Sequence, residues 1–168
     1  MMYHNITKDD MLNGEGLRVV LWLSGCDHRC EGCHNPLTWD PDEGLVFDDE
    51  AKNEVFSYLS RDYISGLTLS GGDPLYVNNI DEVTGFCQVV KDRFPEKTIW
   101  LYTGNTFENI KKLDVMKYID VCVDGEFVKS LHDNNLLWKG SSNQRVIDVK
   151  KTFMQGGNEP VLYCGDYE

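Results

Sequence analysis

Three cysteines within eight residues constrain this chain more than any other feature of its sequence. The stretch reads SGCDHRCEGCHN at residues 24–35 and holds half of the chain's six cysteines. Thiolates from one short loop can hold an iron–sulfur cluster, because each thiolate binds a different iron atom. An ordinary electron-transfer cluster takes four cysteines, whereas this loop offers Cys26, Cys30 and Cys33. The stretch therefore predicts a [4Fe-4S] cluster whose fourth iron binds an exchangeable ligand.

Other uses of these cysteines fit the sequence less well. Structural zinc usually takes two ligand pairs, and no second Cys-x-x-Cys or His pair follows Cys33. A disulfide needs an oxidising compartment, and residues 1–5 lack the apolar core and cleavage pattern of a secretory signal. His28 and His34 lie beside the cysteines, but a loop histidine is more often solvated than a ligand. Neither is predicted to bind iron.

Composition narrows the class of protein and the class of partner. The 168 residues predict a single domain over 1–168, and no apolar run approaches the ~20 residues that cross a bilayer. The formal charge of −12 argues against nucleic acid as a direct partner, because polyanions attract basic surfaces. Cysteines that must stay reduced favour the cytoplasm. We therefore expect a cytoplasmic protein without membrane or nucleic-acid partners.

Strand patterns alternate with helix patterns along the chain. Short apolar runs typical of strands occur at 17–23, 67–70, 98–102, 119–125 and 145–149, and an edge strand at 158–163 is left open. Residues 1–13 are taken as a polar leader. Helices are expected after the acidic cap at 48–50, from Ile80 to Phe94, and after a cap at Thr106. Cys87 lies on the apolar stripe of the second helix and is expected in the core.

This alternation predicts an α/β fold with a parallel sheet. Eight strand–helix units need about 250 residues to close a barrel, and this chain supplies about five. The expected architecture is an open, partial (β/α) barrel with about five parallel strands. In such sheets ligands gather at the carboxyl ends of the strands.

Three predicted strands end in loops that carry polar or glycine-rich chemistry. The first strand ends at the cysteine stretch, the second at Gly71-Gly72-Asp73-Pro74, and the third at Tyr102-Thr103-Gly104. Paired glycines let the backbone turn sharply and approach a ligand closely. These loops are predicted to lie at one face.

The arrangement resembles the radical S-adenosylmethionine superfamily. The Cys-x3-Cys-x2-Cys spacing is that superfamily's cluster signature, and the turn at 71–74 stands where its members carry a Gly-Gly-Glu-type turn. Stretches at 14–26, 30–36, 70–75 and 140–145 resemble the family of proteins that activate anaerobic ribonucleoside-triphosphate reductases. Asp73 in place of Glu and Gly32 in place of an aromatic residue depart from the superfamily but are similar to this family. The resemblance covers about Gly14 to Lys150.

The resemblance implies a radical SAM activating enzyme with two cofactors, a [4Fe-4S] cluster held by three cysteines and S-adenosylmethionine. Reductive cleavage of S-adenosylmethionine would give methionine and a 5′-deoxyadenosyl radical, which takes a hydrogen atom from a glycine of the reductase. The implied partners are the large subunit of the reductase, as protein substrate, and a flavodoxin-type electron donor. No catalytic side chain is expected beyond the cluster ligands, because the cofactors carry the chemistry.

The resemblance also implies which residues contact S-adenosylmethionine. The backbone of Gly32, Cys33 and His34 is expected to lie along the adenine, and Tyr102 and Thr103 are expected to face the ribose. Gly72 and Asp73 are expected to bind the methionine amino group, and Arg145 the methionine carboxylate. Tyr102 as a core residue and Arg145 as an exposed strand residue remain alternatives, and Arg18 is expected to be structural. Three other functions stay open: a pyruvate formate-lyase activating enzyme, a radical enzyme acting on a small molecule such as a deazapurine-forming lyase, and a non-catalytic metal-binding adaptor.

Overall fold

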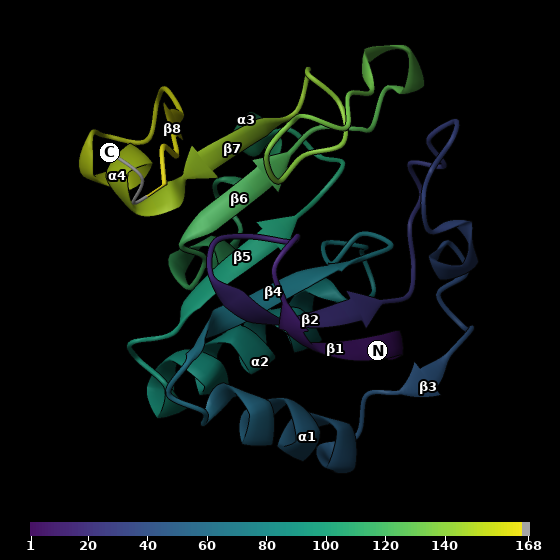
Figure 1. Ribbon diagram of the computed structural model, residues 1–168, viewed down its shortest axis with the longest axis vertical. Coiled ribbons are helices and arrows are strands. Elements are labelled where there is room, and N and C mark those ends of the chain that lie inside the picture. Colours follow the sequence, from purple (N-terminus) through teal and green to yellow (C-terminus); the bar gives the residue numbers. More distant parts are fainter. Residues whose placement is uncertain (166–168) are drawn as a thin grey trace.

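The computed structural model describes residues 1–165, which form one mixed sheet of eight strands in the order β3-β1-β2-β4-β5-β6-β7-β8 (Figure 1). The strands are β1 (Met2–Asp10), β2 (Leu17–Leu23), β3 (Leu45–Val46), β4 (Ile64–Gly71), β5 (Thr98–Tyr102), β6 (Val121–Asp124), β7 (Arg145–Asp148) and β8 (Val161–Leu162). The helices are α1 (Asp49–Leu59), α2 (Ile80–Arg93), α3 (Phe107–Ile110) and α4 (Val149–Met154), with 3-10 turns η1 (Pro36–Thr38), η2 (Asp114–Lys117) and η3 (Lys129–Leu131). The expected mixture of α and β structure is confirmed.

The centre of the sheet is parallel, as the alternation of strands and helices predicted. Strands β2, β4, β5 and β6 pair in parallel, and helices α1, α2 and α3 lie in the connections between them. Asp48 caps α1 by accepting a hydrogen bond from the backbone N–H of Ala51. Thr106 stands at the predicted cap of α3 but makes no side-chain cap bond. The N–H of Phe107 donates instead to Asp124 Oδ2, at 2.7 Å.

The two edges of the sheet are antiparallel, which corrects the prediction in two places. The segment at 145–149 was expected to be a fifth parallel strand, but β7 runs antiparallel to β6. The connection at 125–144 contains only the short turn η3, so no crossover helix returns the chain to the other end of the sheet. The polar leader is β1, paired antiparallel with β2. The open question at 158–163 is answered by β8, which pairs with β7.

The side chains of the parallel strands alternate between two buried faces. One face packs against α1 and α2 through a large apolar cluster that includes Leu21, Leu69 and Leu101 (Figure 1). Cys87 belongs to this cluster and is fully buried, as predicted. On the other face Trp100 packs against Trp138, with ring centroids 5.0 Å apart. No helix among residues 1–165 is long and apolar enough to cross a membrane.

Arg18 is a fully buried arginine on this second face. Its guanidinium donates to Thr68 Oγ1 at 2.7 Å and to the carbonyl oxygens of Leu67 and Thr98 at 2.8 and 3.0 Å. The guanidinium also lies 5.3 Å from the centre of the Trp100 ring. Burial lowers the pKa of Arg18 to about 10, so the side chain stays charged at neutral pH. These contacts join three strands, as expected of a structural residue.

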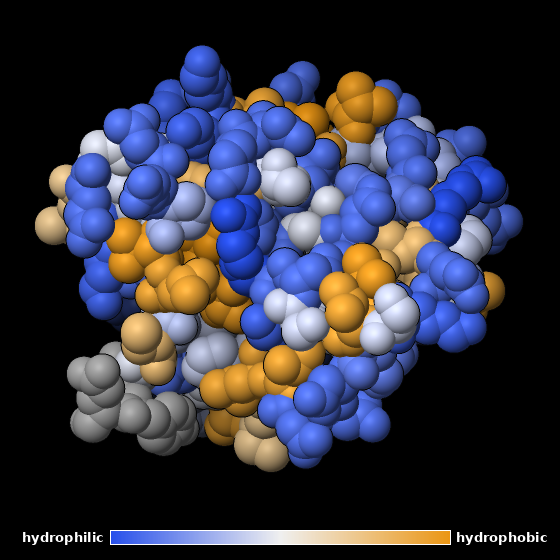
Figure 2. Space-filling model, turned by 90° about the horizontal axis from the view of Figure 1, so that it is seen from above, coloured by the Kyte–Doolittle hydropathy of each residue, from blue (hydrophilic) through white to orange (hydrophobic). Residues whose placement is uncertain are grey.

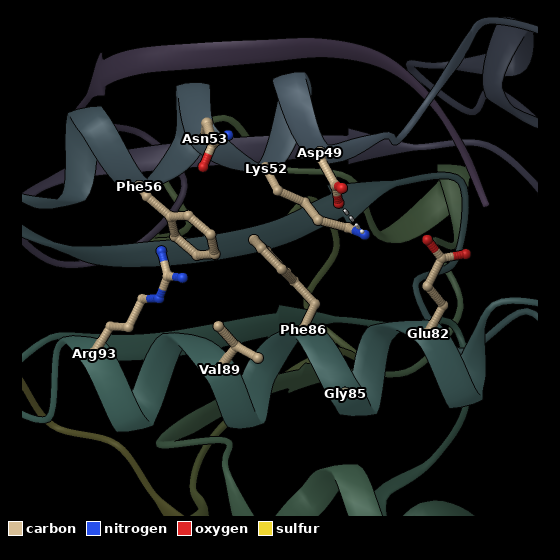
Figure 3. Close-up of a pocket in the computed structure, with 9 residues that line it drawn as sticks. All are labelled: Asp49, Lys52, Asn53, Phe56, Glu82, Gly85, Phe86, Val89 and Arg93. Carbon is tan, nitrogen blue, oxygen red and sulfur yellow. Dashed lines mark hydrogen bonds and ion pairs between the residues drawn. The ribbon is translucent and has the colours of Figure 1, made fainter.

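A hollow of about 650 Å³ lies at the surface between α1 and α2, on the helical side of the molecule (Figure 3). Phe86 and Val89 point from α2 into this hollow, and the guanidinium of Arg93 lies 4.4 Å from the centre of the Phe56 ring. Gly85 faces open space, since no atom lies within 4 Å of an added Cβ. No cysteine lines the hollow, so it is separate from the predicted cluster site.

Candidate functional site

The loops after four strands meet around one cavity of about 190 Å³. In Figure 1 the loop that follows β2 and the loop that follows β6 extend from the same end of the sheet. The residues that line the cavity are Cys26, His28, Cys30, Cys33, His34, Asn35, Ser70, Gly71, Gly72, Tyr102, Thr103, Gly104, Gly125, Phe127, Gly140 and Gln144. The structure thus brings together all three predicted ligands and five of the predicted cofactor contacts. Gly32, Asp73 and Arg145 are not among the lining residues.

Backbone hydrogen bonds close the cysteine loop at its base. The N–H of Gly25 donates to Thr38 O at 2.8 Å, and the N–H of Cys26 donates to Trp39 O at 3.1 Å. The turn after β4 packs directly on this base, where the N–H of Asp73 donates to Gly25 O at 2.8 Å. A Cβ on Gly72 would lie 2.4 Å from Gly25 O, so only glycine permits this approach.

The three cysteine thiols are free and differ in burial. Cys26 is buried, while Cys30 and Cys33 are half-buried. Burial raises the pKa of Cys26 and of Cys30 above the ordinary value, so these thiols are neutral until a bound metal stabilises the thiolates. In the described range 1–165, no three His, Cys, Asp or Glu side chains are close enough to hold a single metal ion. A cluster does not require that convergence, because its thiolates bind separate iron atoms.

Asp73 lies just behind the cavity and joins the loops after β4 and β5. Only 2% of its surface is exposed, and its carboxylate accepts hydrogen bonds at 2.9 to 3.2 Å. The donors are the backbone N–H groups of Leu75 and Gly104, the Thr103 hydroxyl, the Asn105 amide and the His28 imidazole. The sequence predicted a ligand contact here but gave no sign of this buried network.

His28 is half-buried and paired with two carboxylates, whereas the sequence favoured a solvated side chain. Its Nε2 lies 2.9 Å from Asp73 Oδ2 and its Nδ1 lies 2.8 Å from Glu126 Oε1. The hydrogen bond to Asp73 is the main cause that raises the pKa of His28 to about 9, against the effect of burial. The protonated imidazole therefore places a positive charge beside the cysteines. Asp73 and Glu126 are distant in sequence, so no local signal identifies this pairing.

The loop at 125–144 covers the cysteine loop from the other side of the cavity. The rings of His34, Phe127 and His132 contact one another edge to face, with centroids 5.6 to 5.8 Å apart. The side-chain oxygen Oε1 of Gln144 accepts hydrogen bonds from the backbone N–H groups of Gly140 and Ser141, and its Nε2 donates to Gly125 O at 2.9 Å. Phe127 and Gln144 line the cavity but were not predicted as site residues, although 140–145 is one of the stretches that carry the family resemblance.

Tyr102 and Arg145 each have protein partners in the structure. Tyr102 is half-buried, lines the cavity, and donates its hydroxyl to Trp138 O at 2.9 Å. Arg145 binds Asp124 Oδ1 at 3.0 Å and Glu108 at 2.9 and 3.1 Å. It lines a neighbouring polar hollow, and its hydrogen bonds lower the pKa of Glu108. The contact predicted between Arg145 and a methionine carboxylate stays a prediction.

Comparisons with known proteins point to one family. A family model described as a 4Fe-4S single cluster domain matches residues 12–147. The anaerobic ribonucleoside-triphosphate reductase-activating protein of Enterobacteria phage T4 is 50% identical over 146 residues, which cover 87% of this chain and 93% of that protein. Proteins of the same name are 40% identical over 148 residues in Haemophilus influenzae and 39% identical over 150 residues in Escherichia coli K12. These alignments cover 86% and 87% of this chain, and 96% and 97% of the two relatives.

Proposed function

The chain belongs to the family of anaerobic ribonucleoside-triphosphate reductase-activating proteins, and on this basis we propose that it installs a glycyl radical on the large subunit of such a reductase. It would act in the cytoplasm as a radical S-adenosylmethionine enzyme and receive electrons from a flavodoxin-type donor. Residues 1–168 would form a single domain, and the mixed sheet would be the open, partial barrel of that superfamily.

The observation that carries the proposal is the shared cavity of the three cysteines and the turn after β4. Cys26, Cys30 and Cys33 come from one loop and would hold a [4Fe-4S] cluster, with one iron left for S-adenosylmethionine. When bound, the cluster supplies the electron that splits S-adenosylmethionine into methionine and a 5′-deoxyadenosyl radical, which takes the hydrogen atom of the target glycine. The donor set fits this group, because within residues 1–165 three thiols and no fourth cysteine line the cavity.

The chain's own residues would orient S-adenosylmethionine beside the cluster. Gly72 lets the turn after β4 lie against the cysteine loop. Asp73 in this turn would stand behind the methionine amino group of bound S-adenosylmethionine. A carboxylate stabilises an ammonium group through a charge-assisted hydrogen bond. Because Asp73 already accepts five donors, a contact with the ammonium requires His28 or another donor to share the carboxylate.

Other predicted contacts complete the proposed binding mode. The backbone of Gly32, Cys33 and His34 would lie along the adenine, and Tyr102 and Thr103 would face the ribose. Cys33, His34, Tyr102 and Thr103 line the cavity, which supports these roles, while Gly32 lies in the same loop. Arg145 would reach the methionine carboxylate only by exchanging its ion pairs with Asp124 and Glu108.

Anaerobic electron paramagnetic resonance tests the proposal directly. The cluster-loaded chain is mixed with the reductase, S-adenosylmethionine and a reductant, and we expect a glycyl radical signal on the reductase. Deuterium from a labelled target glycine should appear in 5′-deoxyadenosine, and replacement of that glycine by alanine should abolish the protein radical. Without the reductase, cleavage should be slow because no productive hydrogen donor is present.

Three outcomes would favour the alternative functions. Rapid turnover of a small molecule by the chain alone, with no response to the reductase, would support a radical lyase. A glycyl radical on pyruvate formate-lyase but none on the reductase would reassign the protein substrate. Absence of S-adenosylmethionine cleavage from the cluster-loaded chain would leave the adaptor interpretation.

A further inference from the structure

A second hollow, of about 410 Å³, lies on the outer side of the cysteine loop and has no role in the proposed chemistry. Its walls come from β1 and β2 on one side and from the end of the cysteine loop on the other. The lining residues are His4, Asn5, Thr7, Trp22, His34, Asn35, Pro36, Leu37 and Thr38. His34 and Asn35 also line the cysteine cavity, so the two spaces share a wall.

Over residues 1–165, the hollow is lined by no acidic residue, lysine or arginine, although the chain is strongly acidic. None of the nine lining residues, all within the described part of the chain, is Asp, Glu, Lys or Arg, whereas the sequence has 28 acidic and 16 basic residues. The hollow between α1 and α2, by contrast, is bordered by Asp49, Lys52, Glu82 and Arg93. Depletion of charge is typical of the buried centre of a protein–protein interface.

Two of the lining side chains are in unfavourable environments: one is apolar and exposed to water, and the other has a buried polar atom without a hydrogen-bond partner among the described residues. Leu37 is 79% exposed at the rim, so its apolar surface faces water. The Nε2 atom of His4 is buried, and within residues 1–165 no group hydrogen-bonds to it. A buried polar atom without a partner is unfavourable, and a ligand that supplies the hydrogen bond recovers that free energy. The hollow is thus suited to an apolar group that carries one hydrogen-bonding atom.

We propose that this hollow, defined by the nine residues above, receives a tyrosine or tryptophan side chain of the reductase. The inference rests on the proposed function, because a reductase whose glycine reaches the cysteine cavity must cover the adjoining surface. Aromatic side chains with a polar atom are the usual anchors of such interfaces. Trp22 and Leu37 would contact the ring, and His4 Nε2 would pair with the hydroxyl or indole N–H. Seen from above, apolar residues form separate clusters on a mainly hydrophilic surface, so docking would depend on local anchors (Figure 2).

The test compares two leucines of similar exposure. Leu37→Glu places a carboxylate at the rim of the hollow, while Leu12→Glu changes a leucine that is 81% exposed in the turn between β1 and β2, at the other end of β2. Affinity for the reductase is measured by biolayer interferometry under nitrogen, with the cluster-loaded chain and no reductant. Loss of an anchor contact should raise the Kd of Leu37→Glu at least about tenfold, and Leu12→Glu should stay within about twofold of the unchanged chain.

Further measurements separate loss of docking from loss of the site. Because Leu37 lies in the cysteine loop, Asn5→Arg on β1 blocks the same hollow from a different element and should weaken binding similarly. Iron content and S-adenosylmethionine cleavage without the reductase should be unchanged in Asn5→Arg. His4→Phe should weaken binding about three- to tenfold, as expected for one lost hydrogen bond.

The proposal is overturned if Leu37→Glu and Asn5→Arg both bind the reductase as the unchanged chain does. It is also overturned if they weaken binding of the electron donor, of a second copy of the chain or of a free nucleoside while reductase binding stays the same. If the unchanged chain neither binds nor activates the reductase, the proposed function fails instead. A photo-crosslinker at position 37 should label a reductase peptide next to a tyrosine or tryptophan.

Discussion

The six cysteines of this chain occupy three different environments. Cys26, Cys30 and Cys33 line the cavity, Cys87 and Cys122 are fully buried elsewhere, and Cys164 is exposed near the end of the described residues. Burial raises the pKa of Cys87 to about 12, so its thiol is neutral and unreactive at physiological pH. Of the six, only Cys26, Cys30 and Cys33 come from one loop and line a common cavity.

Replacement of Cys26, Cys30 or Cys33 by serine should abolish cluster retention, because serine is a poor iron ligand and two thiolates hold the cluster too weakly. Iron content and visible absorbance after anaerobic reconstitution measure this. Cys87→Ser, Cys122→Ser and Cys164→Ser are the matched controls and should keep the absorbance, with some loss of stability where a buried hydroxyl lacks a partner. A requirement for any control cysteine would contradict the three-ligand assignment.

Asp73→Ala should destabilise the chain even without cofactors, because it leaves several buried donors without an acceptor. We expect the free energy of unfolding of the apo chain to fall by on the order of 3 kcal/mol in urea denaturation. Asp62→Ala, at an exposed position, should change it by less than about 0.5 kcal/mol. Equal effects of the two substitutions would mean that the network around Asp73 is not structural.

Asp73→Ala should also weaken S-adenosylmethionine binding by roughly ten- to a hundredfold.

At the scale of elements, the sequence predicted best where burial imposed a clear pattern. The runs at 17–23 and 98–102 are buried on both faces and are strands in the structure. β1 was missed because most of its residues are polar and only partly buried. The direction of β7 was predicted wrongly because the alternation of strands and helices was extended to it. No helix pattern was found at 125–144, although a parallel strand would need a crossover there.

Gly85→Ala should stabilise helix α2. Gly85 lies inside the helix, has no positive φ, and leaves open space where a Cβ would be. Alanine loses less backbone entropy in a helix, so the free energy of unfolding should rise by about 1 kcal/mol, as measured by thermal or chemical denaturation. Gly72→Ala is the contrasting control, since its Cβ would lie 2.4 Å from a backbone oxygen. A loss of stability in Gly85→Ala would show that the surface over α2 is covered in solution.

The ion pair of Arg145 and Glu108 joins α3 to β7 and should make stability depend on pH. Arg145 lowers the pKa of Glu108, so the folded state binds this proton less readily than the unfolded chain. The contribution is therefore present above pH 4.5, the ordinary pKa, and is lost as pH falls through the lower folded value. Glu108→Gln should cost less than about 1 kcal/mol at pH 7, because the pair is partly exposed. In urea denaturation at a series of pH values, the difference in free energy of unfolding between Glu108→Gln and the unchanged chain should shrink below pH 4.5. A difference that grew below this pH would contradict the pairing.

For the whole molecule, the position of the site followed from chain order, but its detailed contacts did not. Successive strand ends predicted that the cysteines, Gly72 and Thr103 would meet, and they line one cavity. The pairing of His28 with Asp73 and Glu126 joins segments 45 and 98 residues apart, so no local pattern reveals it. The covering by Phe127 and Gln144 likewise depends on how a long polar loop folds back over the cavity.

Native-state hydrogen exchange should follow the order of strands in the sheet. Amides of β2, β4 and β5, which lie in the parallel centre and are buried on both faces, should exchange slowest and report global unfolding. The two-residue edge strands β3 and β8 should exchange by local opening and much faster. Mass spectrometry of the apo chain checks this order, and slow exchange at β8 would indicate an additional partner at that edge.

The closed base of the cysteine loop determines how the protein can receive and replace its iron. Both ends of the loop are fixed by hydrogen bonds between Gly25 and Thr38 and between Cys26 and Trp39, which need no metal. Only residues 27–37 then have to rearrange around incoming iron and sulfide, so the entropy lost on loading is confined to a short segment. A chain stripped of its cluster by oxygen would keep its scaffold, and a carrier protein could refill it without a new round of folding.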